Sequence, residues 1–305
     1  MNSLDEILER ADRAGPCRVA VAGAEDPEVL RAVQEAQRRG WGSALLAGDA
    51  RRVRRAAEQL GLSLADHEVL DCGGPAEAAA RAVSEVRHGR AQILLKGSVE
   101  TSVLLRAVLD KDRGLSVLRP LSHVAVMQVP SYPKLLLLTD GGVNIAPDLE
   151  RKAEIVRNAV SVAHALGIAR PTVAALAAVE RVDPKMPATV DAAALAVMSR
   201  RGQLGNCVVE GPVAFDLAIS PSHWLKKGME PPFDEPVDII VVPDIEVGNA
   251  LGKSLMLVGR AQTAGIVVGT REPVVLLSRA DPSINKLRCI GLGMLMRQRL
   301  GDQDA

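Results

Sequence analysis

Polar side chains follow several apolar segments of this sequence directly, and glycine often stands beside them. The turns concerned are Lys96-Gly97-Ser98, Asp140-Gly141-Gly142, Glu180-Arg181, Glu210-Gly211-Pro212, Pro243-Asp244 and Ser278-Arg279. In open α/β sheets, ligands collect at the carboxyl ends of the strands, and glycine lets the backbone approach a ligand closely. If the apolar segments are parallel strands, these turns are the first candidates for binding and catalysis.

The turn Lys96-Gly97-Ser98 has the composition of a phosphate site. Free N–H groups at a helix start, the Lys96 charge and the Ser98 hydroxyl all suit a phosphate, and Arg106 lies about two helical turns further on. The alternative is a solvated turn in which Ser98 caps the helix and Arg106 is a surface residue. The sequence contains neither a G-x-x-x-x-G-K-[ST] loop nor a G-x-G-x-x-G turn, so no nucleotide site of those kinds is predicted.

A second cationic turn, Ser278-Arg279, follows the apolar run VVLL near the end of the chain. The planar guanidinium of Arg279 can bind a phosphate group through two points. Asp281, which stands before Pro282, also has the sequence of a helix N-cap, so it has two interpretations.

Composition excludes several classes of function. Lys plus Arg (37) equal Asp plus Glu (37), and Phe 2, Trp 2 and Tyr 1 leave little material for stacking on bases, so neither a nucleic acid nor an acidic membrane surface is predicted as partner. No apolar run approaches the roughly 18 residues that span a bilayer. The four cysteines are scattered and predict buried thiols in a reducing compartment, which indicates a cytoplasmic protein. His123, His164 and His223 have no metal-ligand spacing, and no metal is predicted.

Strands and helices are predicted to alternate along the chain and to position these turns. Continuous apolar runs, typical of strands covered on both faces, are residues 18–23, 43–47, 91–95, 123–129, 134–139, 172–179, 206–209, 238–242, 263–268 and 274–277. Amphipathic helical patterns lie between them, near 27–39, 49–60, 75–88, 99–110, 148–166, 189–201, 245–259 and 283–300. This alternation predicts a mostly parallel sheet with helices on both faces.

Two breaks in the alternation predict two domains. Predicted strands follow one another without a helix at 123–129 and 134–139, and again at 263–268 and 274–277. Such breaks would let the chain leave a first domain and return to it. We therefore expect an α/β fold of two doubly wound domains with a cleft between them. Residues 1–130 plus 267–305 form the first domain, and residues 131–266 form the second, inserted in it.

Six segments, taken in order, resemble the phosphate acetyl/butyryl transferase family over roughly residues 90 to 290. They are KGSVETSVLLRAVLDK (96–111), LLTDGGVNIAPDLERKAEIVRNAV (137–160), VERVDPKMPATVDAAA (179–194), VEGPVAFDLAIS (209–220), VPDIEVGNALGKS (242–254) and LLSRAD (276–281). Each motif alone is weak, but six at compatible spacing are strong. TDGGVN, KMPATVDAA and VPDIEVGN are more similar to the butyryltransferase branch than to the acetyltransferase branch.

The resemblance implies reversible transfer of a short-chain acyl group between coenzyme A and inorganic phosphate, giving acyl phosphate and free coenzyme A. It implies no metal and no bound cofactor, with coenzyme A as a substrate, and a two-domain fold like that of isocitrate and isopropylmalate dehydrogenases. Ser278 and Arg279 correspond to the family's catalytic pair, and Arg106 to its arginine on the helix after the K/S-G turn. Lys96 and Ser98 join Arg106 as candidate ligands of the phosphate.

The sequence departs from the acetyltransferase pattern at two positions. The aspartate proposed there as thiol base corresponds to Asn285, so either Asp281 substitutes for it or the thiol ionises without a side-chain base. A second cleft arginine is also missing, and Lys253 is the candidate to replace it. The remaining candidates for the coenzyme A and substrate cleft are Gly141, Met186, Asp244 and Asn249, although Met186 is equally consistent with simple core packing.

Alternative functions are a phosphate acetyltransferase and a catalytically silent regulatory domain of the same fold. Retention of Ser278, Arg279 and Arg106 weighs against the silent domain, whereas Asn285 favours it. A dehydrogenase of the same plan would need a cluster of metal-binding aspartates and a nucleotide loop, and we find neither in the sequence. We also expect a homo-oligomer, most simply a dimer, because most soluble oligomers are closed homomers and the resembling family is oligomeric.

Overall fold

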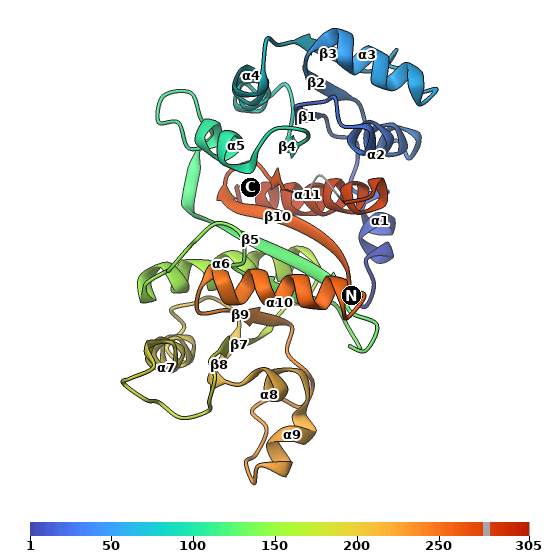
Figure 1. The fold of residues 1–305 in the computed structure, drawn as a ribbon. Coiled ribbons are helices and arrows are strands. Elements are labelled where there is room, and N and C mark those ends of the chain that lie inside the picture. Colours follow the sequence, from blue (N-terminus) through green and yellow to red (C-terminus); the bar gives the residue numbers. More distant parts are fainter. Residues whose placement is uncertain (277–280, 305) are drawn as a thin grey trace. The chain divides into compact units, whose positions relative to one another are not determined.

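Alternating strands and helices build the chain in the computed structural model, which describes residues 1–276 and 281–304 (Figure 1). The strands are β1 (Val19–Ala22), β2 (Ala44–Gly48), β3 (Glu68–Asp71), β4 (Ile93–Lys96), β5 (Val117–Gln128), β6 (Leu136–Thr139), β7 (Thr172–Leu176), β8 (Val208–Val213), β9 (Ile239–Val241), β10 (Gln262–Thr270) and β11 (Val274–Val275). The helices are α1 (Asp5–Ala11), α2 (Pro27–Arg38), α3 (Ala50–Gln59), α4 (Pro75–Arg87), α5 (Thr101–Val108), α6 (Leu149–Ala165), α7 (Pro187–Arg200), α8 (Phe215–Ile219), α9 (Pro221–Lys226), α10 (Ile245–Leu257) and α11 (Ser283–Asp304).

Each apolar run predicted as a strand contains one, because a fully buried strand needs apolar side chains on both faces. The prediction missed β3, whose sequence EVLD has one fully buried residue and lies at the edge of its sheet. It also missed the short helices α8 and α9. No helix within the described residues combines the length and the apolar character that crossing a membrane would require.

The chain divides into two compact units, each described here by itself. The terminal unit comprises Asp5–Leu118 and Ala264–Ala305, and the middle unit comprises Met1–Leu4 and Arg119–Thr263. Whether residues 131–266 fold as an inserted domain stays a prediction, which limited proteolysis would test.

In the terminal unit, β1 lies between two parallel partners. Val21 pairs with Leu46 of β2 on one side and with Leu95 of β4 on the other, and the strand order continues as β3-β2-β1-β4-β11-β10. The pairing of β10 with β11 is antiparallel, which confirms the second predicted break in the alternation. The turns after β1, β2 and β4 therefore share one edge of the sheet.

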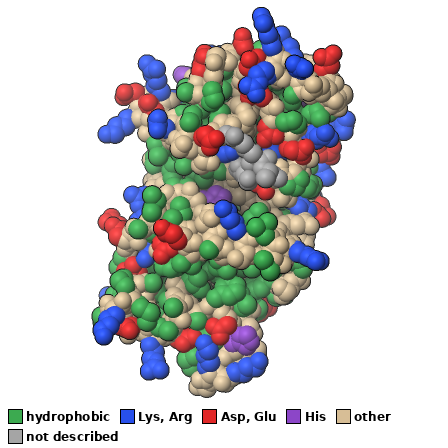
Figure 2. All heavy atoms as spheres, in the orientation of Figure 1, with side chains coloured by type: hydrophobic (Ala, Val, Ile, Leu, Met, Phe, Trp, Pro, Cys, Tyr) green, Lys and Arg blue, Asp and Glu red, His purple; other side chains and the backbone are tan. Residues whose placement is uncertain are grey.

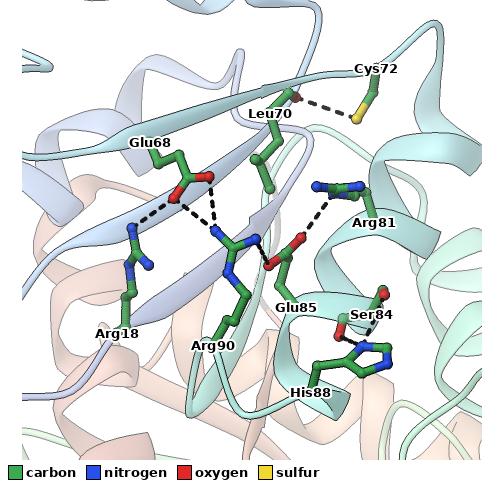
Figure 3. Close-up of polar contacts among 9 residues, drawn as sticks. All are labelled: Arg18, Glu68, Leu70, Cys72, Arg81, Ser84, Glu85, His88 and Arg90. Atoms are coloured by element: carbon green, nitrogen blue, oxygen red, sulfur yellow. Dashed lines mark hydrogen bonds and ion pairs between the residues drawn. The ribbon is translucent and has the colours of Figure 1, made fainter.

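An ion-pair network fixes the edge strand β3 in the terminal unit (Figure 3). Glu68 of β3 pairs with Arg18 at 3.0 Å and with Arg90 at 2.8 Å. Arg90 also reaches Glu85 of α4 at 3.1 Å, and Glu85 pairs with Arg81 at 2.9 Å. Hydrogen bonds and charge from both arginines, led by Arg90, lower the pKa of Glu68. Because β3 buries little apolar surface, these contacts supply part of what holds it.

In the middle unit the strand order is β5-β6-β9-β7-β8, parallel except where β5 meets β6. That antiparallel pair confirms the first predicted break. Strands β6 and β9 are buried along their whole length, so both faces of this sheet are covered. One core cluster joins these strands to Trp224 and Phe233, and α10 contributes partly buried side chains to it.

Candidate active site

The turn after β4 is held against the turn after β1 by backbone contacts. The N–H of Gly97 donates to the carbonyl of Ala22 at 2.8 Å, and the N–H of Ser98 donates to the carbonyl of Gly23 at 2.7 Å. A Cβ atom on Gly97 would lie 2.0 Å from that Gly23 carbonyl oxygen, so no larger residue fits without moving the backbone. This close approach explains why glycine follows Lys96.

The Ser98 side chain bonds to an acid that the sequence interpretation did not single out. Its hydroxyl donates to Glu25 Oε2 at 2.9 Å, while Glu25 Oε1 accepts the N–H of Asp49 at 2.9 Å. Glu25 thus joins the turns that follow β1, β2 and β4. The rule that polar residues after strands are candidates would have found it, because Gly23-Ala24-Glu25 directly follows β1.

This contact corrects one interpretation of Ser98. Helix α5 begins at Thr101 with Glu100 as its N-cap, so the capping role considered for Ser98 is wrong. A hydroxyl can donate only one hydrogen bond, and the Ser98 hydroxyl donates it to the Glu25 carboxylate. Its role as a phosphate ligand stays a prediction, in which the Ser98 hydroxyl would turn from Glu25 to the phosphate, because its backbone N–H already donates to Gly23.

The two candidate cations, Lys96 in this turn and Arg106 on the helix that follows it, differ in burial. Lys96 is 5% exposed and its Nζ lies 3.4 Å from the Gly97 carbonyl oxygen, so its charge is held at the carboxyl end of β4. Arg106 lies in the last turn of α5, exposed, with Leu104 and Val108 buried on the other side of the helix. Arg106 has no hydrogen bond or ion pair with the described residues and is available to an anion.

Ser278 and Arg279 lie outside the described residues. Asp281 is described and buried at 9% exposure, and α11 begins at Ser283. The start of α11 is fixed to α2: the N–H of Ser283 donates to Glu28 at 2.8 Å, and Lys286 pairs with Asp26 at 3.4 Å. These contacts fix the start of α11 in the terminal unit.

In the middle unit, the motif TDGGVN forms a loop closed by its own aspartate. Asp140, 2% exposed, accepts the N–H groups of Gly142 at 2.8 Å, Val143 at 3.0 Å and Asn144 at 3.1 Å. The side-chain amide of Asn144 donates to Asp140 as well, at 2.6 Å. These contacts use both carboxylate oxygens, so Asp140 shapes the loop that follows β6.

Gly141 of this loop contacts the backbone of α10 near the start of the helix. A Cβ on Gly248 would lie 2.7 Å from the Cα of Gly141, so the two backbones touch at a pair of glycines. Asp244 caps α10 by accepting the N–H of Val247 at 2.9 Å, which gives it a structural role. Asn249 and Lys253 are exposed one helical turn apart on α10. The structure thus brings Gly141, Asp244, Asn249 and Lys253 together.

Met186 belongs to a different element of the middle unit. It is the half-buried N-cap residue of α7. Beside the start of α7, Ala188 and Pro243 line a cavity of about 10 Å³, together with the ion pair of Lys152 and Asp191 at 2.7 Å. This volume holds about one water molecule and is too small for an acyl chain. Met186 as part of an acyl pocket stays a prediction.

Comparison with known proteins agrees with the motifs. A family model described as "Phosphate acetyl/butaryl transferase" matches residues 74–292. The chain is 45% identical to the probable phosphate butyryltransferase of Bacillus subtilis over 293 residues, which cover 95% of this chain and 97% of that protein. It is 41% identical to the phosphate butyryltransferase of Clostridium acetobutylicum over 296 residues, covering 97% and 98% of the two chains.

Among solved structures, a branched-chain phosphotransacylase from Enterococcus faecalis V583 superposes with a TM-score of 0.80. The two chains are 36% identical, and the match covers 92% of this chain and 99% of that one. The α/β fold expected from the sequence and the family resemblance are both confirmed. The protein belongs to the phosphate acetyl/butyryl transferase family.

Proposed function

We propose that this protein is an acyltransferase that moves a short-chain acyl group, butyryl in the first place, reversibly between coenzyme A and inorganic phosphate. The observation that carries the proposal is the near-complete match to two phosphate butyryltransferases at 41% and 45% identity. The turn after β4 supports it, because it holds the cation Lys96 and leads into α5, which carries the exposed Arg106.

In the direction that consumes acyl phosphate, the coenzyme A sulfur attacks the acyl carbonyl carbon. The carbonyl electrons move to oxygen, and the collapse of that oxyanion breaks the bond between carbon and the phosphate oxygen. The phosphate leaves with the electron pair of that bond, and the thiol proton passes to a base or to the departing phosphate. No covalent enzyme intermediate is needed, so the protein has to position two substrates and stabilise negative charge.

The cations of the terminal unit suit this demand. In the proposal, Arg279 and Arg106 bind the phosphate group, and Lys96 adds positive charge at the end of β4. Ser278 donates a hydrogen bond to the oxyanion or the thiolate, and Asp281 is the candidate base. In the middle unit, Gly141, Asp244, Asn249 and Lys253 stay the candidates for contacts with coenzyme A, and Met186 stays the candidate for contact with the acyl chain.

The direct test is an assay of the purified protein with butyryl-CoA and phosphate, following release of the free thiol. Arg279→Ala and Arg106→Ala should each lower kcat, or raise the KM for phosphate, by a factor on the order of 10². Arg279→Lys should recover little activity, because an ammonium cannot reproduce the two-point guanidinium contact. An inactive wild-type protein would favour the silent regulatory domain.

The acyl preference separates the two enzyme branches. Burying two further methylenes is worth about 1.6 kcal/mol, or roughly a 15-fold preference for butyryl over acetyl. Comparison of kcat/KM for acetyl-, propionyl-, butyryl- and valeryl-CoA at fixed phosphate measures it. A series led by acetyl-CoA would remove the butyryl assignment and leave phosphate acyl transfer in place.

We further propose that the protein works as a homodimer in the cytoplasm. Leu257 and Val258, at the end of α10, are 80% and 83% exposed, an unfavourable state for large apolar side chains that a second copy of the chain would relieve. Four free, buried cysteines suit a reducing compartment. Light scattering should give twice the mass of the 32.3 kDa chain, and Leu257→Lys with Val258→Lys should shift the protein towards monomer.

A further inference from the structure

Histidine is the side chain whose ordinary pKa, about 6.5, lies near neutral pH, and this protein has five of them. Figure 2 shows few histidine side chains on the face drawn there, among many lysines, arginines and acids. Four of the five rings are hydrogen-bonded to the backbone: His67 to the N–H of Ala44, and His88, His164 and His223 to the carbonyls of Ser84, Asn206 and Asp216. The ring of His123, by contrast, is partly exposed and forms no hydrogen bond with the residues that the structure describes.

The sheet register places His123 opposite the aspartate of the TDGGVN motif. Strands β5 and β6 are antiparallel, with Ala125 opposite Leu138. Two residues further on, the same register brings His123 opposite Asp140, and the Thr139 hydroxyl donates to the His123 carbonyl at 2.8 Å. His123 therefore lies at the edge where the parallel strands β6, β7 and β9 have their carboxyl ends, which is where ligands bind in such sheets. A search of residues that follow strands misses it, because β5 runs in the other direction.

The side chain of His123 lies on the face of the sheet that α10 covers. Successive side chains of a strand point to opposite faces, and the Ser122 hydroxyl accepts a hydrogen bond from Asn158 of α6 at 2.9 Å. His123 is therefore on the other face, where α10 packs against β5 and β6. A Cβ on Gly142 would lie 3.3 Å from the His123 Cβ, so the histidine contacts the turn that follows β6. That turn contains Gly141, a candidate for contact with coenzyme A.

The electrostatics of this position suit a base. Burial lowers the pKa of His123, while the negative charge of Asp140 acts in the opposite direction. The neutral ring has a lone pair that can accept a proton, and Asp140 stabilises the imidazolium that forms. Asp140 keeps its own place, because both of its oxygens accept hydrogen bonds within the loop.

Of the charges around His123, that of Asp140 acts on its pKa. The other charged groups on β5 and on the helices packed against this face are Arg119, Asp244, Glu246, Lys253 and the ion pair of Asp216 with Lys227. Asp244 caps α10, and Glu246 and Lys253 are exposed on that helix.

We propose that His123 is the general base that takes the proton of the coenzyme A thiol, in place of Asp281. This inference rests on the proposed function, which requires a thiol to attack the acyl carbonyl. The S–H bond breaks, its electron pair stays on the sulfur as the C–S bond forms, and the proton passes to the unprotonated ring nitrogen. In the reverse reaction the imidazolium returns the proton to the departing thiolate. The ordinary pKa of an imidazole, about 6.5, is closer to that of a thiol, about 8.5, than a carboxyl's value of about 3.9, so imidazole is the better base at neutral pH.

The test measures kcat/KM for coenzyme A against pH, with butyryl phosphate as acyl donor, in the wild type and in His123→Gln. In the wild type kcat/KM should fall as pH drops below the pKa of His123, because imidazolium cannot accept a proton. The variant should lose on the order of 10²-fold at pH 7. Its kcat/KM should then rise tenfold per pH unit up to the thiol pKa, since attack would depend on thiolate formed without a base. The shape of each profile is independent of the fraction of protein that is folded, and a variant profile parallel to the wild type would overturn the inference.

Two further variants complete the design. His223→Gln is the matched control, because it removes another partly exposed histidine of the middle unit, and it should keep the wild-type profile. Asp281→Asn tests the competing base and should retain the fall of kcat/KM at acid pH. Loss of that fall in Asp281→Asn, with its retention in His123→Gln, would overturn the inference and leave the proposed function in place. A wild-type protein that transfers no acyl group would overturn both.

A measurement on the wild type alone needs no folded variant. Nuclear magnetic resonance follows the protonation of each of the five histidine rings as pH changes. One ring should titrate at the pKa that the acid side of the kcat/KM profile gives. A profile whose pKa matches none of the five rings would overturn the inference.

Discussion

At the scale of single residues, Glu25 and Ser98 form a hydrogen bond whose contribution to the reaction rate can be measured. Their hydrogen bond joins positions 73 residues apart and anchors the turn that carries Lys96. Glu25 touches no reacting group in this arrangement, so we treat it as a positioning residue for the Lys96-Gly97-Ser98 turn.

We predict that Glu25→Gln lowers kcat more than it changes the KM for coenzyme A. The amide can still accept one hydrogen bond but cannot accept both, so the turn is held less firmly, and precise positioning contributes strongly to rate. Ser98→Ala should lower kcat by a similar factor, and the double variant should be no worse than the worse single one, since both changes act on the same contact. Additive losses in the double variant would show that Ser98 acts independently of Glu25.

Glu68 provides a prediction for the dependence of stability on pH. Its pKa is lowered in the folded protein, so its ion pairs stabilise the fold above the ordinary value of 4.5, and this contribution is lost as pH falls through the lower folded value. The free energy of unfolding should therefore differ between wild type and Glu68→Gln at pH 7, and the difference should shrink as the solution is acidified below pH 4.5. A difference that stays constant down to pH 3 would contradict the assignment.

At the scale of elements, α10 is placed by a contact between two glycines. Gly248 lies in the second turn of this helix and touches Gly141 of the loop after β6, where the carboxylate of Asp140 fixes the loop. Neither partner can retreat easily, because the loop is bonded to its own aspartate and α10 is capped by Asp244.

We predict that Gly248→Ala destabilises the protein by about 1–3 kcal/mol, as overpacking of a tight contact does. The added Cβ would lie 2.7 Å from Gly141 Cα and 2.9 Å from the Asp140 carbonyl oxygen. Denaturant unfolding measures the change. Gly252→Ala, one turn further along α10, is the matched control: its Cβ would come within 3.4 Å of Leu138 only, which is ordinary contact. Equal stability of the two variants would argue against the glycine contact.

At the scale of the whole molecule, the four cysteines are free and buried, as the scattered spacing in the sequence predicted. Burial raises the pKa of Cys17 to about 11 and that of Cys289 to about 12. The Cys289 sulfur also accepts the N–H of Gly265 at 3.0 Å, so it packs inside the terminal unit. None of these thiols is predicted to take part in the reaction.

A thiol reagent should therefore react slowly with the native protein at pH 8, because reaction requires the accessible thiolate. All four thiols should react once the chain is unfolded in guanidinium chloride, and butyryl transfer should survive brief exposure of the native protein to the reagent. Rapid loss of activity with modification of one thiol would place a cysteine in the active site and overturn this prediction.

The sequence alone was enough for most of the elements, for the fold class and for the family. Continuous apolar runs show which segments are buried on both faces, and this pattern is local, so strands such as β1 and β6 could be read from it. The edge strand β3 was not predicted, because a strand held by the ion pair of Glu68 and Arg90 has only a weak apolar pattern in its sequence. The motifs also point to the turns after the strands, since any parallel sheet presents its carboxyl ends on one edge.

Which side chains meet on that edge was settled only by the tertiary structure. The order β3-β2-β1-β4 places the turns after β1, β2 and β4 together, and only then does Glu25 meet Ser98 and the backbone of Asp49. Sequence spacing does not specify which strands become neighbours, because that depends on the summed packing of distant segments. For the same reason the contact between Gly141 and Gly248 could not be read from either motif. Local sequence patterns determined which segments form strands and helices, and long-range packing determined which of these elements became neighbours.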